Sequence, residues 1–278
     1  MAQAKANYQA TAAGFSEAAR TYDQDEEGNF SLAWMRERAA LVMERAFEPD
    51  STLLELGCGT GIEAARFARS GRKLVLTDVS AAMLEQAAAK VKQVRPEALL
   101  GIQQCPAAEA GALLLEQYGS SSFDGVYSSF GPLNCEPDLE PVAAGLAKLV
   151  KPGGRLVFSV INRLYPLEMA WFALHLEFKN ARRRLGGPVL ARAVAGGALS
   201  VTTYYYSPAD FKRAFAPAFR LVSCRALPLL LPPPYLAHLV KGVPAFFRLL
   251  GRADDALAGL PLLNSLGDHF LIELERTR

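Results

Sequence analysis

Residues 53–61 of this 278-residue chain read Leu-Leu-Glu-Leu-Gly-Cys-Gly-Thr-Gly, a mainly apolar run followed by a turn with three glycines. The apolar run is typical of a buried β-strand, and a helical pattern follows from Ile62 to Arg69. Glycine adopts positive φ and lets a ligand approach the backbone where a Cβ would collide. The stretch therefore predicts a strand, a glycine turn and a helix, with a ligand-binding surface at the turn.

Short apolar runs and alanine-rich segments alternate outward from this turn. They predict strands at 52–56, 73–77, 99–104, 123–128 and 155–160, and helices at 62–69, 81–94 and 139–149. The run Lys151-Pro152-Gly153-Gly154 is a signal that ends the last of these helices. Strands that alternate with helices indicate βαβ units, so we expect a doubly wound α/β fold built on a parallel sheet.

The flanking regions have other patterns. A helix is predicted at 31–47, with Ser31 as its N-cap, packed on one face of the sheet. After the fifth strand, 162–203 is interpreted as helical and locally basic, and 208–215 as a helix capped by Ser207 with Pro208 in its first turn. Two more strands are predicted at 219–227 and 269–274, with a proline- and leucine-rich stretch, 228–267, between them.

Composition excludes several classes of protein. Thirty Lys and Arg against 28 Asp and Glu give a net charge of +2, too small for a non-specific nucleic-acid binder. Four cysteines without a CxxC pair favour reduced thiols rather than disulfides or a metal site, so we expect a cytoplasmic protein. The N-terminus has no apolar signal-like segment, and the longest apolar stretch, 226–237, carries four prolines. No transmembrane segment is expected.

An acidic residue gives the glycine turn its chemical meaning. Asp78 lies 21 residues beyond Gly57, at the end of the second predicted strand, where a carboxylate can accept both hydroxyls of a ribose. The spacing is GxGxG rather than the GxGxxG of dinucleotide binders, and Glu63 in the first helical turn would repel a pyrophosphate. The turn suits a nucleoside without phosphates, such as S-adenosyl-L-methionine (SAM), whose ammonium group Glu55 could attract.

Four motifs in order, ELGCGTG, TDVSAAML, FDGVYSSFGPLN and LVKPGGRLVFSV, resemble those of the class I SAM-dependent methyltransferases. They span Leu53 to Val160, and the resemblance is strongest to the small-molecule branch that includes the quinone-biosynthesis and type 11 methyltransferases. The resemblance implies a Rossmann-like, seven-stranded sheet whose last strand is antiparallel, which matches the five predicted strands plus two. It also implies SAM as the cofactor.

The resemblance further implies a set of cofactor contacts. The glycine turn would line the methionine arm, Asp78 would hold the ribose, and other residues would flank the adenine or face the methionine end. In the family an Asp often follows the third strand and meets the adenine amino group, but this chain has Pro106 there, so the backbone of Ala107 and Ala108, or Glu109, would take that role. The remaining implied contacts are Gly57, Cys58, Gly59, Gly61, Val79, Met83, Ser128 and Phe130.

Methyl transfer needs alignment of donor and acceptor in a dry cavity more than dedicated catalytic groups. Three residues are nevertheless candidates. His269 begins the last predicted strand on the ligand-binding edge and is a candidate base, with a satisfied structural histidine as the alternative. Tyr205, within a run of three tyrosines, is a substrate wall or a phenol donor, with plain strand packing as the alternative. Asn134 follows the fourth strand and either binds substrate or caps a helix.

The chain outside the motifs is interpreted as a lid and a cap. Tyr22 and Arg36 resemble lid residues that meet the methionine carboxylate, and a guanidinium pairs well with a carboxylate. Both long insertions follow parallel strands, so they emerge at the cofactor edge, and their aromatic content favours an apolar substrate passage. The predicted division is an N-terminal helical lid at 1–50, a SAM-binding core at 51–161 and a first cap insertion at 162–206. The end of the core sheet is predicted at 207–227 and 268–278, and a second cap insertion at 228–267.

The sequence therefore predicts a SAM-dependent methyltransferase that acts on a small, apolar molecule at oxygen, nitrogen or carbon. Two alternatives stay open: a non-catalytic SAM- or lipid-binding protein, and a dinucleotide-dependent oxidoreductase. No nucleic-acid partner and no metal are expected. A basic amphipathic segment in the first insertion leaves room for peripheral membrane contact, and the sequence gives no oligomeric state.

Overall fold

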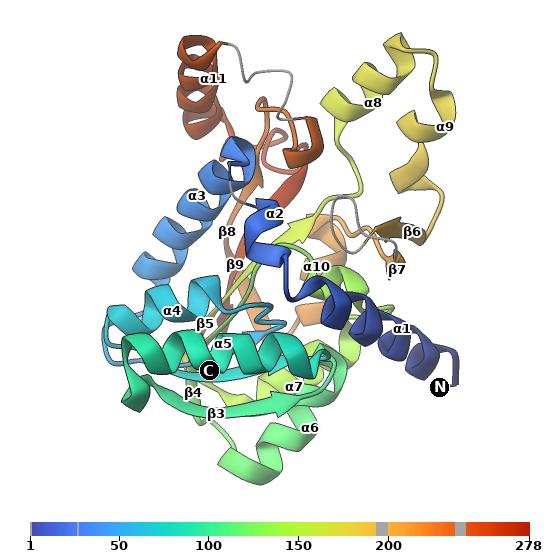
Figure 1. Ribbon diagram of the computed structural model, residues 1–278. Helices are drawn as coiled ribbons and strands as arrows, with labels where there is room; N and C mark the ends of the chain where they lie inside the picture. Colours follow the sequence, from blue (N-terminus) through green and yellow to red (C-terminus); the bar gives the residue numbers. More distant parts are fainter. Residues whose placement is uncertain (1, 27, 193–199, 237–242) are drawn as a thin grey trace.

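The computed structural model describes residues 2–26, 28–192, 200–236 and 243–278. Its centre is a seven-stranded sheet in the order β3-β2-β1-β4-β5-β9-β8 (Figure 1). The strands β1 to β5 are parallel, whereas β9 runs antiparallel to both β5 and β8. The predicted fold, with its reversed last strand, is confirmed. The strands are β1 (Thr52–Leu56), β2 (Lys73–Asp78), β3 (Leu99–Gln104), β4 (Phe123–Ser128), β5 (Val150–Ile161), β8 (Phe219–Leu227) and β9 (His269–Arg276).

Helices cover both faces of the sheet because alternate strand residues point to opposite sides. Leu53 packs with α3 (Phe30–Ala46), α4 (Ile62–Arg69) and α5 (Ala81–Val94). Its neighbour Leu54 packs on the other side with α6 (Ala107–Tyr118), α7 (Glu140–Leu149) and α10 (Pro208–Phe215). Two apolar cores therefore hold the sheet between them, as a doubly wound fold requires.

Helices α6 and α7 approach each other through two glycines. A Cβ built on Gly111 would lie 2.3 Å from the Cα of Gly145, and a Cβ on Gly145 would lie 2.7 Å from the Cα of Gly111. Both distances are below any real contact of a Cβ, so the backbones touch where side chains would otherwise separate them. Helix α6 itself was not among the predicted helices, although it fills the expected place between β3 and β4.

Two local predictions differ from the structure, and a third is confirmed. The N-cap of α3 is Asn29, whose side chain accepts the Leu32 N–H at 3.1 Å, while the Ser31 hydroxyl instead donates to the Pro232 carbonyl at 2.7 Å. Helix α7 ends at Leu149 as predicted, but β5 begins at once, because Val150 already pairs with Phe123. The capping of α10 by Ser207 is confirmed, with Asp210 completing a capping box.

The predicted helical insertion 162–203 is only partly helical. It contains α8 (Pro166–Leu174), α9 (Phe178–Ala181) and η3 (Arg183–Leu185), followed by a two-stranded antiparallel sheet of β6 (Val189–Arg192) and β7 (Ser200–Thr203). The β-branched residues of β7 favour a strand, which explains the difference. The second insertion contains α11 (Pro244–Leu257); α8 and α11 rise at the same end of the molecule (Figure 1).

The N-terminal segment forms α1 (Ala2–Ala18) and α2 (Tyr22–Glu26), which lie over the carboxyl edge of the sheet (Figure 1). The Ser16 and Ser80 hydroxyls are 2.8 Å apart, and the Gln86 amide donates to the Ala19 carbonyl at 2.8 Å. Two short 3₁₀ turns complete the architecture, η1 (Pro96–Ala98) and η2 (Pro132–Cys135). No helix in the described ranges is long and apolar enough to span a membrane.

A buried ionic network joins the first insertion to the sheet. The Arg184 guanidinium contacts Glu168 Oε2 at 2.6 Å and Asp268 Oδ1 at 2.6 Å, and all three side chains are at most 6% exposed. Asp268 also lies 3.0 Å from His269 Nδ1. Burial opposes ionisation of Asp268, but Arg184 and His269 outweigh it and hold the pKa of this carboxyl below its usual range.

Candidate active site

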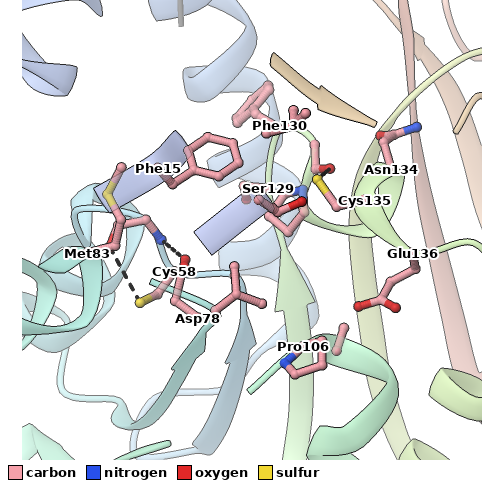
Figure 2. Close-up of a pocket in the computed structure, with 18 of the residues that line it drawn as sticks. Phe15, Cys58, Asp78, Met83, Pro106, Ser129, Phe130, Asn134, Cys135 and Glu136 are labelled. Carbon is pink, nitrogen blue, oxygen red and sulfur yellow. Dashed lines mark hydrogen bonds between the residues drawn. The ribbon is translucent and has the colours of Figure 1, made fainter. Parts of the chain in front are cut away.

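A cavity of about 220 Å³ opens at the carboxyl edge of the parallel strands, below α1 and α2. Open α/β sheets bind ligands at this edge, because the loops after the strands converge there. Figure 2 shows the cavity with residues from the loops after β1, β2, β3 and β4 around it. Most residues predicted for the site line it: Tyr22, Arg36, Glu55, Gly57, Cys58, Gly59, Asp78, Val79, Met83, Ala107, Phe130, Asn134 and Tyr205.

Four predicted residues do not line the cavity. Gly61 begins α4 with φ +82°, and a Cβ there would lie 2.6 Å from the Cα of Ala87, so this glycine serves the packing of α4 on α5. Ser128 turns inward and donates to the Leu56 carbonyl at 2.7 Å. Ala108 and His269 also lie outside the lining: the Ala108 N–H donates to Glu136 Oε1 at 3.3 Å, and His269 Nδ1 lies 3.0 Å from Asp268 Oδ2.

The glycine turn and Asp78 form one hydrogen-bonded unit. The Gly59 N–H donates to Asp78 Oδ2 at 2.9 Å, and the Ser80 N–H donates to Oδ1 at 2.9 Å. Gly59 has φ +51°, and a Cβ on it would meet no protein atom within 4 Å, so it would project into open space at the cavity wall. Burial raises the pKa of Asp78, although the hydrogen bonds from Ser80, Gly59 and Val79 oppose that shift.

Glu55 is a second buried carboxyl on the cavity wall. It is 1% exposed, and the Tyr127 hydroxyl donates to its Oε2 at 2.9 Å. Burial raises its pKa well above the usual range, with a further contribution from the negative charge of Glu63. A cation placed in the cavity would relieve this unfavourable environment and stabilise the ionised carboxylate.

Arg36 of α3 reaches the cavity from the lid side. Its guanidinium forms an ion pair with Glu63, and it also lies over the Phe130 ring at 5.1 Å from the ring centroid. Phe130 has φ +60°, a conformation that is strained for a residue with a Cβ. The His269 ring also contacts Phe130, in an edge-on arrangement with the ring centroids 5.8 Å apart.

His269 itself does not face the cavity. It is buried, and Nδ1 contacts Asp268 in the ionic network that holds the first insertion. Within the described part of the chain, no histidine lines the cavity. His269 therefore contacts the ring of Phe130 and does not itself line the cavity. This position does not support the prediction that His269 acts as a base.

Asn134 lines the cavity, but its polar atoms are engaged elsewhere. Its amide donates to the carbonyls of Ile161 at 3.0 Å and Tyr204 at 2.7 Å, and its oxygen accepts the Ile161 N–H at 2.8 Å. These bonds fasten the loop after β4 to β5 and to the first insertion. These contacts give Asn134 a structural role, although it is not the helix cap proposed as the alternative.

Two hydroxyls at the cavity have no hydrogen-bond partner in the parts of the chain that the structure describes. The Ser129 Oγ is buried and unsatisfied, and no partner is found for the Tyr205 hydroxyl. A buried hydroxyl without a partner is costly, so Ser129 is suited to a ligand. Tyr205 is only partly buried, and its hydroxyl can also bind a ligand. The sequence prediction chose Ser128; the residue that lines the cavity is its neighbour.

Glu136 is a cavity residue that the sequence prediction missed. It is 2% exposed, its Oε2 accepts the Tyr8 hydroxyl of α1 at 2.5 Å, and its Oε1 accepts the Ala108 N–H at 3.3 Å. Burial raises the pKa of Glu136, and the hydrogen bonds from Tyr8, Ala108 and Ala107 oppose the shift. Figure 2 shows this carboxylate beside Pro106, directed toward the cavity. The only sequence signal was an acidic residue shortly after the fourth strand.

The seven-stranded sheet with one reversed strand, the glycine turn and the facing acidic strand end define the class I methyltransferase fold. A solved structure of Burkholderia thailandensis 1,6-didemethyltoxoflavin-N1-methyltransferase, with S-adenosylhomocysteine bound, shares the fold. It aligns with a TM-score of 0.54 and 16% identity over 95% of this chain and 87% of that one. A solved methyltransferase from Methanosarcina mazei aligns with a TM-score of 0.56 and 15% identity, over 85% and 97% of the two chains.

Sequence comparison identifies the family. Residues 53–154 match the family model described as "Methyltransferase domain". The malonyl-[acyl-carrier protein] O-methyltransferase of Erwinia pyrifoliae is 30% identical over 71% of this chain and 69% of its own length. The ubiquinone biosynthesis O-methyltransferase of Hahella chejuensis is 32% identical over 45% of this chain and 50% of its own length. The chain belongs to the SAM-dependent methyltransferases, and its methyl donor is SAM.

The shared region is only part of several of these relatives. The match covers 28% of the length of the bifunctional biotin-biosynthesis protein of Saccharophagus degradans and 69% of the length of the Erwinia pyrifoliae enzyme. The similarity therefore covers the methyltransferase unit with small-molecule acceptors as a class, and the acceptor of this chain is a separate question.

Proposed function

We propose that SAM binds along the β1–β2 edge of the cavity and that its methyl group points toward Phe130. When bound, SAM supplies an electrophilic methyl group. Glu55 attracts the ammonium group, Asp78 accepts the ribose hydroxyls, and Gly59 leaves room for the methionine arm. Val79 and Met83 flank the adenine, while the lid residues Tyr22 and Arg36 meet the methionine carboxylate.

The single observation that carries this proposal is the linked pair of Gly59 and Asp78. Their 2.9 Å hydrogen bond fixes an acidic group beside open space that any Cβ at Gly59 would occupy. Both oxygens of Asp78 keep acceptor capacity after their backbone bonds, because a carboxylate has about four acceptor sites. The unsatisfied Ser129 hydroxyl at the same cavity adds a polar contact for the ligand.

We propose that the acceptor is a small, uncharged and mainly apolar molecule, methylated on oxygen. Four carboxyl groups line the cavity, Glu55, Glu63, Asp78 and Glu136, against one cation among the described lining residues, Arg36, which already pairs with Glu63. An anionic acceptor would be repelled, whereas the cationic donor is attracted. The relatives named O-methyltransferases support oxygen as the acceptor atom.

The acceptor side of the cavity is formed by the first insertion. Ala191, Val201, Thr203 and Tyr205 line it, and no described residue of 228–267 does. We therefore propose 162–206 as the substrate cap of a core at 51–161, and 228–267 as a support behind it. Residues 1–50 form the lid, and 207–227 with 268–278 complete the sheet. Arg184 of this insertion belongs to the ionic network and does not line the cavity.

Alignment and exclusion of water are then the main contributions of the chain to the reaction. We assign the hydrogen bond to the acceptor oxygen to Tyr205, because Tyr205 lines the cavity on the side of the first insertion and its hydroxyl has no partner in the described residues. With no histidine at the described lining, we expect an acceptor such as a phenol, whose neutral oxygen takes the methyl group while its proton passes to water as the carbon–oxygen bond forms.

The test is calorimetric binding of S-adenosylhomocysteine together with methylation of an acceptor panel. Asp78→Ala should weaken binding by about 1–3 kcal/mol through loss of a charged acceptor. Gly59→Val should abolish binding because its side chain fills the ligand's space, and thermal unfolding would confirm that both variants fold. Asp138→Ala, an exposed acidic change, is the control. Unchanged affinity in both site variants would refute the binding mode.

The acceptor proposal is tested separately with phenols, amines and a malonyl thioester offered to the same enzyme. We expect methyl transfer to phenolic hydroxyls and little to the malonyl carboxylate, because the cavity is acidic. Exclusive methylation of the carboxylate would contradict the charge argument while leaving the cofactor site in place.

A further inference from the structure

We propose that Glu136 recognises the adenine of the cofactor by accepting a hydrogen bond from its exocyclic amino group. The inference rests on the binding mode proposed above. It assigns adenine recognition to a residue of the loop after β4, at a place where the loop after β3 offers no side chain for it.

The loop after β3 has no polar side chain at the cavity that could hydrogen-bond the edge of the base. Pro106 carries neither an N–H nor a polar side chain. Glu109, the other acidic residue of this segment, is exposed and does not line the cavity. The backbone N–H of Ala108 is already bonded to Glu136. The carboxylate of Glu136 is thus the polar group that stands at the N-terminus of α6 and faces the cavity.

The carboxylate has an acceptor site left for a ligand. A carboxylate offers about four acceptor positions. Tyr8 occupies one on Oε2, Ala108 occupies one on Oε1, and Ala107 contributes a further backbone hydrogen bond. One position therefore remains, on a group that is 2% exposed and whose neighbours hold it in place.

The surroundings fit a flat aromatic base. Met83 of α5 and Phe15 of α1 both line the cavity, and they belong to one apolar cluster. Figure 2 shows both side chains on the Asp78 side of the cavity. A ribose held at Asp78 would place its base against this apolar surface, with the outer edge of the base toward Pro106 and Glu136.

The chemistry of the base edge makes the proposal specific. Adenine presents an N6 amino donor at the edge where hypoxanthine presents a carbonyl oxygen. A carboxylate accepts from the first and repels the second. Because burial raises the pKa of Glu136, an amino donor also stabilises the ionised form that the empty cavity disfavours. A purely structural cap of α6 would not distinguish the two bases.

The experiment compares the binding of S-adenosylhomocysteine and its deaminated analogue, S-inosylhomocysteine, by calorimetry. We expect the unaltered protein to prefer the adenosyl ligand by about tenfold or more, the scale of a charge-assisted hydrogen bond. Glu136→Gln should reduce that preference to about threefold or less, because an amide can donate to the carbonyl of the analogue. The matched control is Glu116→Gln, on the exposed side of α6, which should keep the full preference.

Tyr8→Phe keeps the carboxylate and removes its partner, so the preference should persist; its collapse would assign the discrimination to the phenol. Equal binding of the two ligands by the unaltered protein overturns the proposal whether or not Glu136→Gln folds. An undiminished preference in a folded Glu136→Gln protein also overturns it. The binding mode fails separately, if Asp78→Ala leaves the affinity for both ligands unchanged.

Discussion

The cofactor edge of the core and the first insertion both bury charged groups, but they treat these groups in opposite ways. In the core, Glu55, Asp78 and Glu136 have raised pKa values, because their burial outweighs the hydrogen bonds that they accept and, at Glu55, the positive charge of Arg36. In the insertion network, Asp268 is equally buried but has a lowered pKa, because Arg184 contacts it. The chain itself supplies the cation that pairs with the buried carboxyl groups of the network. At the core edge, a cationic ligand would supply that charge.

This difference separates stability from function in the molecule. A completed buried ion pair holds elements in place, and removal of one partner is costly because the other remains buried. An uncompensated carboxyl is a cost to the empty protein that a cationic ligand removes. Substitutions that change one charge at a time in each region test this difference.

The largest effect is expected for Arg184→Ala. The change removes the buried cation that Glu168 and Asp268 share and leaves them only Arg183 and His269, respectively. We expect the free energy of unfolding to fall by about 3–5 kcal/mol. Urea unfolding measures the loss, with Arg182→Ala as the exposed control. S-adenosylhomocysteine affinity should change little, because Arg184 does not line the cavity. A loss below about 1 kcal/mol would mean that the network does not hold the insertion.

An intermediate effect of opposite sign is expected for Glu55→Gln. The folded-state pKa of Glu55 is raised, so its contribution to stability is fully present below the unfolded value of about 4.3 and is lost as pH rises through the folded pKa. At pH 8 the variant should therefore be more stable than the unaltered protein, by on the order of 1 kcal/mol. The gain should shrink toward acid pH.

Thermal unfolding between pH 4 and 8 in the absence of ligand measures that gain, and calorimetry should show weaker ligand binding in the same variant. Equal stability of the two proteins at pH 8 would argue that the carboxyl group is compensated within the chain. Stronger ligand binding by the variant would argue against an ammonium contact.

The smallest effect is expected for Asp255→Asn. The ion pair of Asp255 with Arg38 joins α11 to α3 at 2.8 Å, but both side chains are substantially exposed. Exposed pairs contribute about 0–1 kcal/mol, and salt screens them. The free energy of unfolding should change by less than about 1 kcal/mol, and less still in 0.5 M salt. A loss as large as that of Arg184→Ala would remove the distinction between buried and exposed pairs.

The core was predictable because its signals are local. Strands β1 and β3 and helices α4 and α5 have the predicted bounds, since periodicity and caps lie within each segment. The β6–β7 hairpin was not predicted, because its pairing depends on contacts between segments. The ionic network shares that limit: Arg184 meets Asp268, 84 residues away, and no periodicity encodes such a contact.

The site divides in the same manner. Gly59 and Asp78 follow from motif spacing and line the cavity as expected, although their roles toward SAM stay predictions. Ser128 and Ser129 differ by one position, and only the direction of the last strand residue decides which one faces the ligand. Glu136 depends on the path of the loop after β4 and on a tyrosine 128 residues earlier, so no sequence pattern could place it.

The contact of Gly111 with Gly145 restricts how this chain can change over generations. When two large side chains clash, a smaller residue at one position can accommodate a larger one at the other. Here each position already carries the smallest residue, and each Cβ would meet the backbone of the other helix at 2.3 or 2.7 Å. No substitution at one glycine can therefore make room for a larger residue at the other. Both positions must remain glycine unless the two helices move apart.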